Sequence, residues 1–129
     1  MSVLDFLAAI RSRPRQQPAR FVLRYVPPGG THVTVGRLEF SDGMWTFRYD
    51  PEYKRRQDLR PLEGFNDLDR EYRSGVLFPF FAIRIPDLDR SDVKRKLDEA
   101  RVRDPDIADL LRIFGRRVVS SPAFELLPA

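Results

Sequence analysis

The sequence contains no cysteine and a single histidine, His32. The missing cysteines exclude a disulfide framework, a thiolate nucleophile and cysteine-ligated zinc or iron–sulfur sites. One histidine excludes a multi-histidine metal site and leaves little room for histidine-based catalysis. Long apolar runs are missing too, since none approaches the roughly 20 residues that a membrane-spanning helix needs. Because the first ten residues lack a basic leader and carry Asp5, we expect no signal peptide, no membrane partner and a cytoplasmic location.

Lysine is also scarce. Only three of the 23 basic residues are lysine, and the remaining 20 are arginine, whose planar fork of donors suits carboxylates and phosphates. The 19 acidic residues are interspersed among them, which leaves a net charge of +4. This mixture favours an ion-paired surface, with nucleic-acid binding as the alternative. A length of 129 residues with 42% apolar residues predicts one soluble globular domain.

Residues 1–20 are predicted to form an arm in front of a domain of residues 21–129. The spacing of the apolar residues at the start predicts a short amphipathic helix over 2–10. Residues 11–20 contain two prolines and no apolar residue larger than alanine, which indicates an extended linker. The candidate nucleic-acid contacts of this linker are Arg11, Arg13, Arg15 and Arg20.

Three strands are predicted to follow as a meander, over residues 21–26, 32–40 and 44–49. Inside the second strand the apolar residues change from one face to the other. Because strand side chains alternate strictly, this change indicates a β-bulge, and Gly36 is the residue best suited to it. The third strand places an aromatic stripe on one face, which we expect to point into the core: Trp45, Phe47 and Tyr49.

Helix starts and a last strand are indicated further along the chain. Asp50 with Pro51 is suited to begin a short helix, and Asp89 or Ser91 to cap a helix that ends near Arg101. Asp104-Pro105 predicts the start of another helix, which Gly115 ends. Residues 117–127 are predicted to form a final strand, and Pro122 inside it indicates an edge position or a bulge. The expected fold class is α+β, with a small mixed or antiparallel sheet packed with short helices.

Two stretches leave the structure open. Residues 58–75 carry turn formers and no clear period. Residues 74–87 are the most apolar part of the chain, and their apolar side chains cannot all face one side of a short strand. This stretch is therefore either a buried turn of helix or, in part, an exposed apolar patch that forms a binding surface.

Motifs for catalysis or metal binding are absent from the sequence. It has no glycine-rich phosphate loop, no G-x-S-x-G elbow and no H-E-x-x-H pair. The aspartates of PDLDRSD lack the glycine and the distal glutamate of a calcium loop, so helix capping explains them better. We therefore expect a protein that is not an enzyme and that needs no cofactor or metal.

The order of several motifs resembles the N-terminal domain of HipA-type serine/threonine kinases. The resemblance covers about residues 21–128, and its motifs are V-G-R-L at 35–38, F-R-Y-D-P-E-Y at 47–53, P-L at 61–62, F-F-A-I-R-I-P-D at 80–87 and D-L-L-R-I-F-G at 109–115. The nucleotide-binding and catalytic residues of those kinases follow this domain, and none of them lies in this sequence. A free-standing copy of the domain resembles HipS, the small protein of tripartite HipB–HipS–HipT toxin–antitoxin systems.

This resemblance implies a non-catalytic antitoxin that binds and inhibits a HipT-like serine/threonine kinase. A HipB-like helix-turn-helix protein, and through it operator DNA, is a further implied partner. Two stretches depart from the family pattern. The serine-rich stretch of the family is replaced by residues 63–68, and no bulky aromatic follows Pro86-Asp87 to plug the kinase. The residues expected to face the kinase are Phe78, Phe80, Phe81, Ile83, Arg84, Pro86, Asp87, Leu88 and Asp89.

Overall fold

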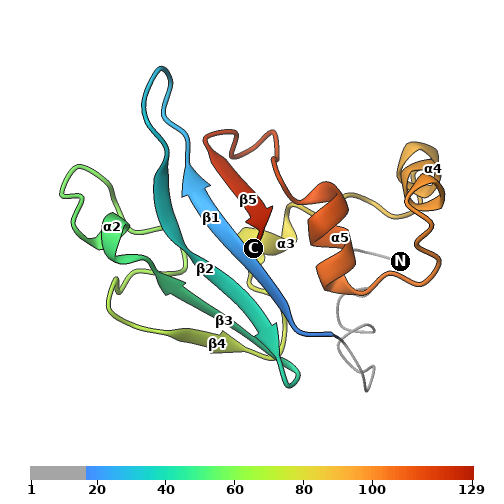
Figure 1. The fold of residues 1–129 in the computed structure, drawn as a ribbon, viewed down its shortest axis with the longest axis horizontal. Coiled ribbons are helices and arrows are strands. Elements are labelled where there is room, and N and C mark those ends of the chain that lie inside the picture. The colour runs from blue at the N-terminus through green and yellow to red at the C-terminus, as the bar shows by residue number, and fades with distance from the viewer. Residues whose placement is uncertain (1–16) are drawn as a thin grey trace.

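The computed structural model describes residues 17–129. The helix expected over residues 2–10 and the linker residues Arg11, Arg13 and Arg15 lie outside this range. The described part contains, in chain order, β1 (Ala19–Tyr25), β2 (Val33–Ser41), β3 (Met44–Tyr49), α2 (Pro51–Lys54), β4 (Tyr72–Ser74), α3 (Pro79–Ala82), α4 (Ser91–Glu99), α5 (Ile107–Phe114) and β5 (Phe124–Pro128) (Figure 1).

The strands form one antiparallel sheet in the order β4-β3-β2-β1-β5. The expected α+β class, with a meander and a C-terminal strand, is confirmed. The predicted edge position of the last strand is also confirmed, because β5 lies beside β1 at one end of the sheet that residues 17–129 form. Its predicted bounds are wrong, since residues 117–123 form turns and β5 begins after Pro122. Proline has no N–H to donate to a strand ladder, so the chain enters the sheet only beyond it.

The bulge predicted in the second strand is present. Leu23 of β1 is paired with Gly36 and the next residue, Arg24, with Thr34, so Val35 has no partner on β1. Glycine is required at this bulge because a Cβ at Gly36 would lie 2.4 Å from the carbonyl oxygen of Arg48. Val35 and Leu38 are therefore both buried although they belong to opposite phases of the strand.

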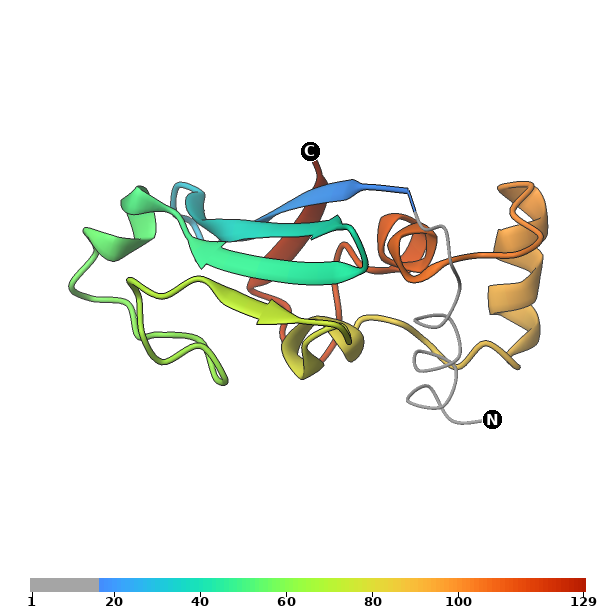
Figure 2. The ribbon, with the colours of Figure 1, turned by 90° about the horizontal axis from the view of Figure 1, so that it is seen from below.

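One face of the sheet carries the core, and the helices of the described residues leave the other face uncovered. The aromatic stripe of β3 is buried on the inner face, as predicted. α3 and the segment between α2 and β4 lie on this inner side, and the opposite face carries no helix from residues 17–129 (Figure 2). Phe47 of β3 is fully buried in this core, and its ring centroid lies 4.5 Å from that of Phe65 and 5.5 Å from that of Phe81.

The helix starts were predicted with mixed success. At α2, Asp50 accepts a hydrogen bond from the Glu52 amide and Pro51 is the first helical residue, as predicted. The two later starts are wrong. α4 follows Arg90, which caps it with no side-chain hydrogen bond, so neither Asp89 nor Ser91 is its cap. α5 follows Asp106, not Asp104.

The start of α5 has a clear physical reason. Asp106 and Asp109 form a reciprocal capping box, in which the Asp106 carboxylate accepts from the Asp109 amide at 2.8 Å and the Asp109 carboxylate from the Asp106 amide at 3.1 Å. This arrangement satisfies two backbone N–H groups at the helix start at once. It therefore stabilises a start at Asp106 more than a single aspartate followed by proline would stabilise a start at Asp104. Gly115 ends the helix, as predicted.

Candidate functional site

The most apolar stretch of the chain combines both structures that the sequence left open. It forms the short helix α3, which Pro79 begins, and the side chains of Phe81, Ala82 and Ile85 are buried. Ile83 on the same turn is 53% exposed. Phe78 and Phe80 lie between these extremes, packed against the core yet partly open to solvent. One side of α3 therefore anchors the helix and the other presents apolar side chains at the surface.

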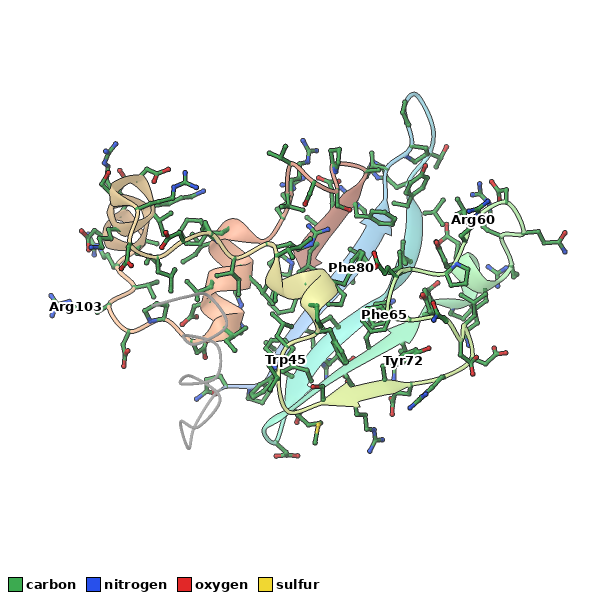
Figure 3. All side chains as sticks on the ribbon, turned by 180° about the vertical axis from the view of Figure 1, so that it is seen from behind. Trp45, Arg60, Phe65, Tyr72, Phe80 and Arg103 are labelled. Carbon is green, nitrogen blue, oxygen red and sulfur yellow. The ribbon has the colours of Figure 1, made fainter. Side chains whose placement is uncertain are left out.

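Phe65 supports α3 from the segment that precedes β4. Its ring centroid lies 5.1 Å from that of Phe78, 6.2 Å from that of Phe80 and 5.0 Å from that of Tyr72, all in edge-to-face contacts. Figure 3 shows Phe65 and Phe80 side by side on the inner side of the sheet. Such contacts favour fixed ring orientations, so the exposed edge of this cluster has a defined shape.

Two hollows flank Phe80 and together form one surface, which we call the Phe80 groove. The first, of about 430 Å³, is lined by Glu63, Gly64, Phe65, Phe78, Pro79, Phe80 and Ile83. The second, of about 320 Å³, is lined by Tyr25, Tyr53, Leu59, Arg60, Pro61, Leu62, Glu63, Phe80 and Phe124. Because both share Glu63 and Phe80, the hollows are adjacent. The lining is mainly apolar, which suits an apolar partner side chain.

One acid and one base lie on the groove wall. Glu63 and Arg60 are both exposed, and neither forms an ion pair within the part of the chain that the structure describes. Groups that carry no internal partner remain available to a partner of opposite charge. The Phe80 groove thus combines an apolar floor with two charges at its rim.

Two tyrosines hold the wall of the groove in place. The Tyr49 hydroxyl donates to the Phe65 carbonyl at 2.5 Å and accepts from the Leu62 amide at 2.8 Å. The Tyr53 hydroxyl donates to the Arg60 carbonyl. Burial raises the pKa of Tyr49 to about 12, so its hydroxyl stays protonated and keeps donating. These bonds fix residues 60–65, which carry no regular secondary structure.

The chain matches the model of one protein family. The family model of the HipA N-terminal domain matches residues 31–120. The chain belongs to the HipA N-terminal domain family. No curated protein and no solved structure matches the chain. The matched range contains β2 to α5, and with them α3 and most of the Phe80 groove.

Within this HipA N-terminal domain, two of the residues expected to face a partner are turned inward. Phe81 is fully buried, and Arg84 is 3% exposed. The Arg84 guanidinium donates to the carbonyl oxygens of Gly115 at 2.9 Å, Arg116 at 3.1 Å and Phe124 at 3.3 Å. Phe81 packs against Phe47 and Phe65 in the core, and Arg84 joins the end of α3 to the segment after α5 and to β5. Sequence reasoning missed this role, although an arginine inside the most apolar stretch was a signal for it.

The end of the expected loop is a tight turn. The Asp87 carboxylate accepts from the Asp89 amide at 2.9 Å, and both side chains are exposed. Leu88 between them is partly buried against the domain's own core, and Pro86 is half-buried. The side chains that this HipA N-terminal domain presents at the surface of the stretch are therefore Phe78, Phe80, Ile83, Asp87 and Asp89.

The groove residues that sequence reasoning missed come from the segment left unassigned at residues 58–75. This segment contains Phe65, Glu63 and Arg60, and the short edge strand β4 lies near its end. Three residues are too few to show a period-two pattern. The tyrosines of β3 and α2 offered an indirect signal, because a buried tyrosine needs a hydrogen-bond partner for its hydroxyl.

Other candidate sites gain no support within the described range. Residues 17–129 hold no group of three or more histidine, cysteine, aspartate or glutamate side chains placed to bind a metal ion. His32 is exposed beside a turn. Arg20, the one linker arginine inside the range, is exposed on β1. None of the helices described has the length and apolar character required to cross a bilayer.

Proposed function

We propose that this HipA N-terminal domain is a non-catalytic antitoxin-like subunit that binds the core of a HipT-like serine/threonine kinase and inhibits it. The observation that carries the proposal is the Phe80 groove, an apolar surface of defined shape in a domain of this family. Apolar surface of this kind at the rim of a pocket is characteristic of binding sites for other proteins.

The groove supplies the anchor of the proposed complex. Ile83 and the exposed edges of Phe78 and Phe80 lose contact with water when an apolar segment of the kinase occupies the hollows. A few such anchors at the centre of an interface account for most of its affinity. Glu63 and Arg60 at the rim pair with charges of the partner and fix its orientation.

The turn after α3 supplies the inhibitory contact. Leu88 packs on the domain itself, so no large side chain of this turn projects outward as a plug. The exposed carboxylates of Asp87 and Asp89 project instead. In the proposed complex they approach the cationic and metal-binding groups that a kinase uses for nucleotide phosphates, and thereby compete with the nucleotide.

The test is binding to a HipT-type kinase core from the same genome, measured by calorimetry, and autophosphorylation of that kinase with and without the domain. Ile83→Asp is the informative variant, because it places a charge in the groove at a position that is already half exposed. Val119→Asp is the matched control, since Val119 is 95% exposed in a turn and lines neither hollow of the groove.

We expect Ile83→Asp to weaken binding at least about tenfold through loss of an apolar anchor, and Val119→Asp to leave it unchanged. Equal behaviour of the two variants would reject the groove as the interface. Asp87→Asn/Asp89→Asn should still bind the kinase but inhibit it less. No complex and unaltered kinase activity with the unmodified domain would reject the proposal as a whole.

Nucleic-acid binding, alone or with a HipB-like protein on operator DNA, is an alternative outcome of the same work. It requires a mobility shift of duplex DNA whose affinity falls steeply with salt. Its sequence basis was the linker, of which only Arg20 lies in the described range.

A further inference from the structure

The outer face of the sheet, remote from the core, carries an uneven distribution of charge. Over β2, β3 and β4 the basic side chains are balanced by acids. Arg37 lies 3.9 Å from Asp50, Arg48 lies 3.8 Å from Glu39 and Arg73 lies 2.8 Å from Glu71. This part of the face therefore has no strong local charge.

Where β1 meets β5 the balance is lost. Three arginines surround one carboxylate, Glu125. Arg24 donates to its Oε1 from Nε at 3.1 Å and from Nη2 at 2.9 Å, and the Nε atoms of Arg116 and Arg117 each donate to Oε2 at 3.0 Å. We call these four residues the arginine corner. It carries three positive charges against one negative charge.

The carboxylate of the corner remains charged. Burial alone would raise the pKa of Glu125, but hydrogen bonds from Arg116, Arg24 and Arg117 outweigh this effect and lower the pKa to about 2. The buried guanidinium of Arg84 donates to backbone carbonyls of residues 115, 116 and 124, which belong to or adjoin the corner in the chain, and no carboxylate within the described range pairs with it. The same corner of the fold thus holds a fourth positive charge.

The outer arginines keep donors for a ligand. The Nη groups of Arg116 and one Nη group of Arg117 have no partner within residues 17–129, and the two side chains are 60% and 66% exposed. Glu125 holds both guanidinium groups in place, so part of the side-chain entropy that a ligand would have to overcome is already lost on folding. Fixed arginine forks with free donors match the oxygens of a phosphate group in geometry and in charge.

We propose that the arginine corner is a binding site for a phosphate group, with Arg116 and Arg117 as its direct ligands and Glu125 as the residue that positions them. The site is separate from the Phe80 groove. Phe124 lines the groove, whereas its neighbour Glu125 points to the opposite face of β5. Arg24 and Glu125 also lie outside residues 31–120, the range that matches the family.

The experiment follows the arginine Nε–H signals of the full chain by NMR during titration with sodium phosphate, against sodium chloride at equal ionic strength. We expect the signals of Arg116 and Arg117 to shift in a saturable way with phosphate only, with a dissociation constant on the order of 1 mM. A serine peptide and its phosphoserine form make a second pair of probes. Tighter binding of the phosphoserine peptide than of inorganic phosphate identifies a phosphorylated protein as the source of the phosphate, and equal binding identifies the free anion.

Arg116→Gln/Arg117→Gln should weaken phosphate binding at least about tenfold, since each removes charged hydrogen bonds. Arg48→Gln/Arg73→Gln is the matched control, because it removes the same charge from the balanced part of the same face. Equal weakening by both variants would show diffuse attraction and overturn the proposal, as would identical titrations with phosphate and chloride. None of these measurements involves a kinase, so they stand or fall apart from the proposed antitoxin role.

Discussion

Arg84 permits the sharpest test of how this domain is held together. Its guanidinium is buried, carries no acidic partner within the described residues and binds three backbone carbonyls that follow α5 or begin β5. The perturbation is Arg84→Met, which retains a side chain of similar length and removes the donors. The three carbonyl oxygens then lose their charged donor in a site closed to water.

The magnitude follows from two opposing terms. Three hydrogen bonds from a charged donor contribute about 1.5–3 kcal/mol each, or about 4–9 kcal/mol together. Burial of the charge costs about 3 kcal/mol, because desolvation lowers the pKa of Arg84 from 12.5 to about 10 and one pKa unit corresponds to about 1.4 kcal/mol. The difference leaves a net loss of about 1–6 kcal/mol in the free energy of unfolding, centred near 3 kcal/mol.

The assay is urea unfolding followed by the fluorescence of Trp45, the single tryptophan, which is 1% exposed. We expect a lower midpoint with an unaltered slope. Arg84→Lys separates charge from geometry. A single ammonium cannot reach the three carbonyls as a planar guanidinium does, and it is more strongly hydrated. Arg84→Lys should therefore lower the free energy of unfolding at least as much as Arg84→Met.

The control is Arg112→Met on α5, where the arginine is exposed and its pair with Asp109 contributes little. We expect a change below about 0.5 kcal/mol there. An equally small change for Arg84→Met would refute the reasoning, because it would mean that the desolvation penalty cancels the hydrogen bonds. A stable Arg84→Lys variant beside an unstable Arg84→Met variant would refute the importance of the fork.

Three further predictions concern the bulge, the groove wall and acid stability. Gly36→Ala should lower the free energy of unfolding by about 2 kcal/mol or more, because its Cβ would meet the Arg48 carbonyl at 2.4 Å; urea unfolding checks this, and a neutral result would contradict the bulge geometry. Tyr49→Phe should cost about 1–3 kcal/mol and speed hydrogen exchange at the Leu62 amide, which loses its acceptor; unchanged exchange there would contradict the tyrosine's role in fixing the wall. The pKa of Glu125, about 2 against an ordinary value of 4.5, means that its ion pairs stabilise the fold above about pH 4.5 and lose up to about 3 kcal/mol as the pH falls toward 2. When the free energy of unfolding is measured across this pH range, it should depend less on pH in the Glu125→Gln variant. An unchanged dependence on pH would show that Glu125 is not the source of the acid sensitivity.

The elements predicted well are those in which local chemistry and tertiary packing agree. The change of face around Gly36 revealed the bulge, because side chains in a regular strand alternate strictly between its two faces. Apolar residues of both alternations can be buried on the same side only if the strand contains an extra residue. The β3 stripe pointed inward because the same face of a meander carries apolar residues on its neighbours. The start of α2 was predicted correctly because its N-cap, Asp50, and its first helical residue, Pro51, are adjacent in the sequence and both favour a helix start.

The elements predicted poorly depend either on competition between neighbouring caps or on partners elsewhere in the chain. The capping box at Asp106 prevailed over Asp104 through a reciprocal pair of bonds, and a single aspartate followed by proline could not reveal this competition. β4 has three residues, and its place is set by pairing with β3. The wall of the Phe80 groove has no repeat at all, and hydroxyl groups of Tyr49 and Tyr53 hold it across 7 to 16 residues of sequence.

Arg84 shows why the candidate site needed the structure. In the sequence it lies between Ile83 and Ile85 in a stretch expected to face a partner, and its charge favours a surface position. In the fold, Ile83 points outward while Arg84 is buried, because the carbonyls of residues 115, 116 and 124 offer it acceptors that no nearby residue reveals. The arginine thereby sets the orientation of α3, which places Phe80 and Ile83 at the groove. Under the proposed function, this coupling predicts that Arg84→Met also weakens kinase binding under conditions where the variant remains folded.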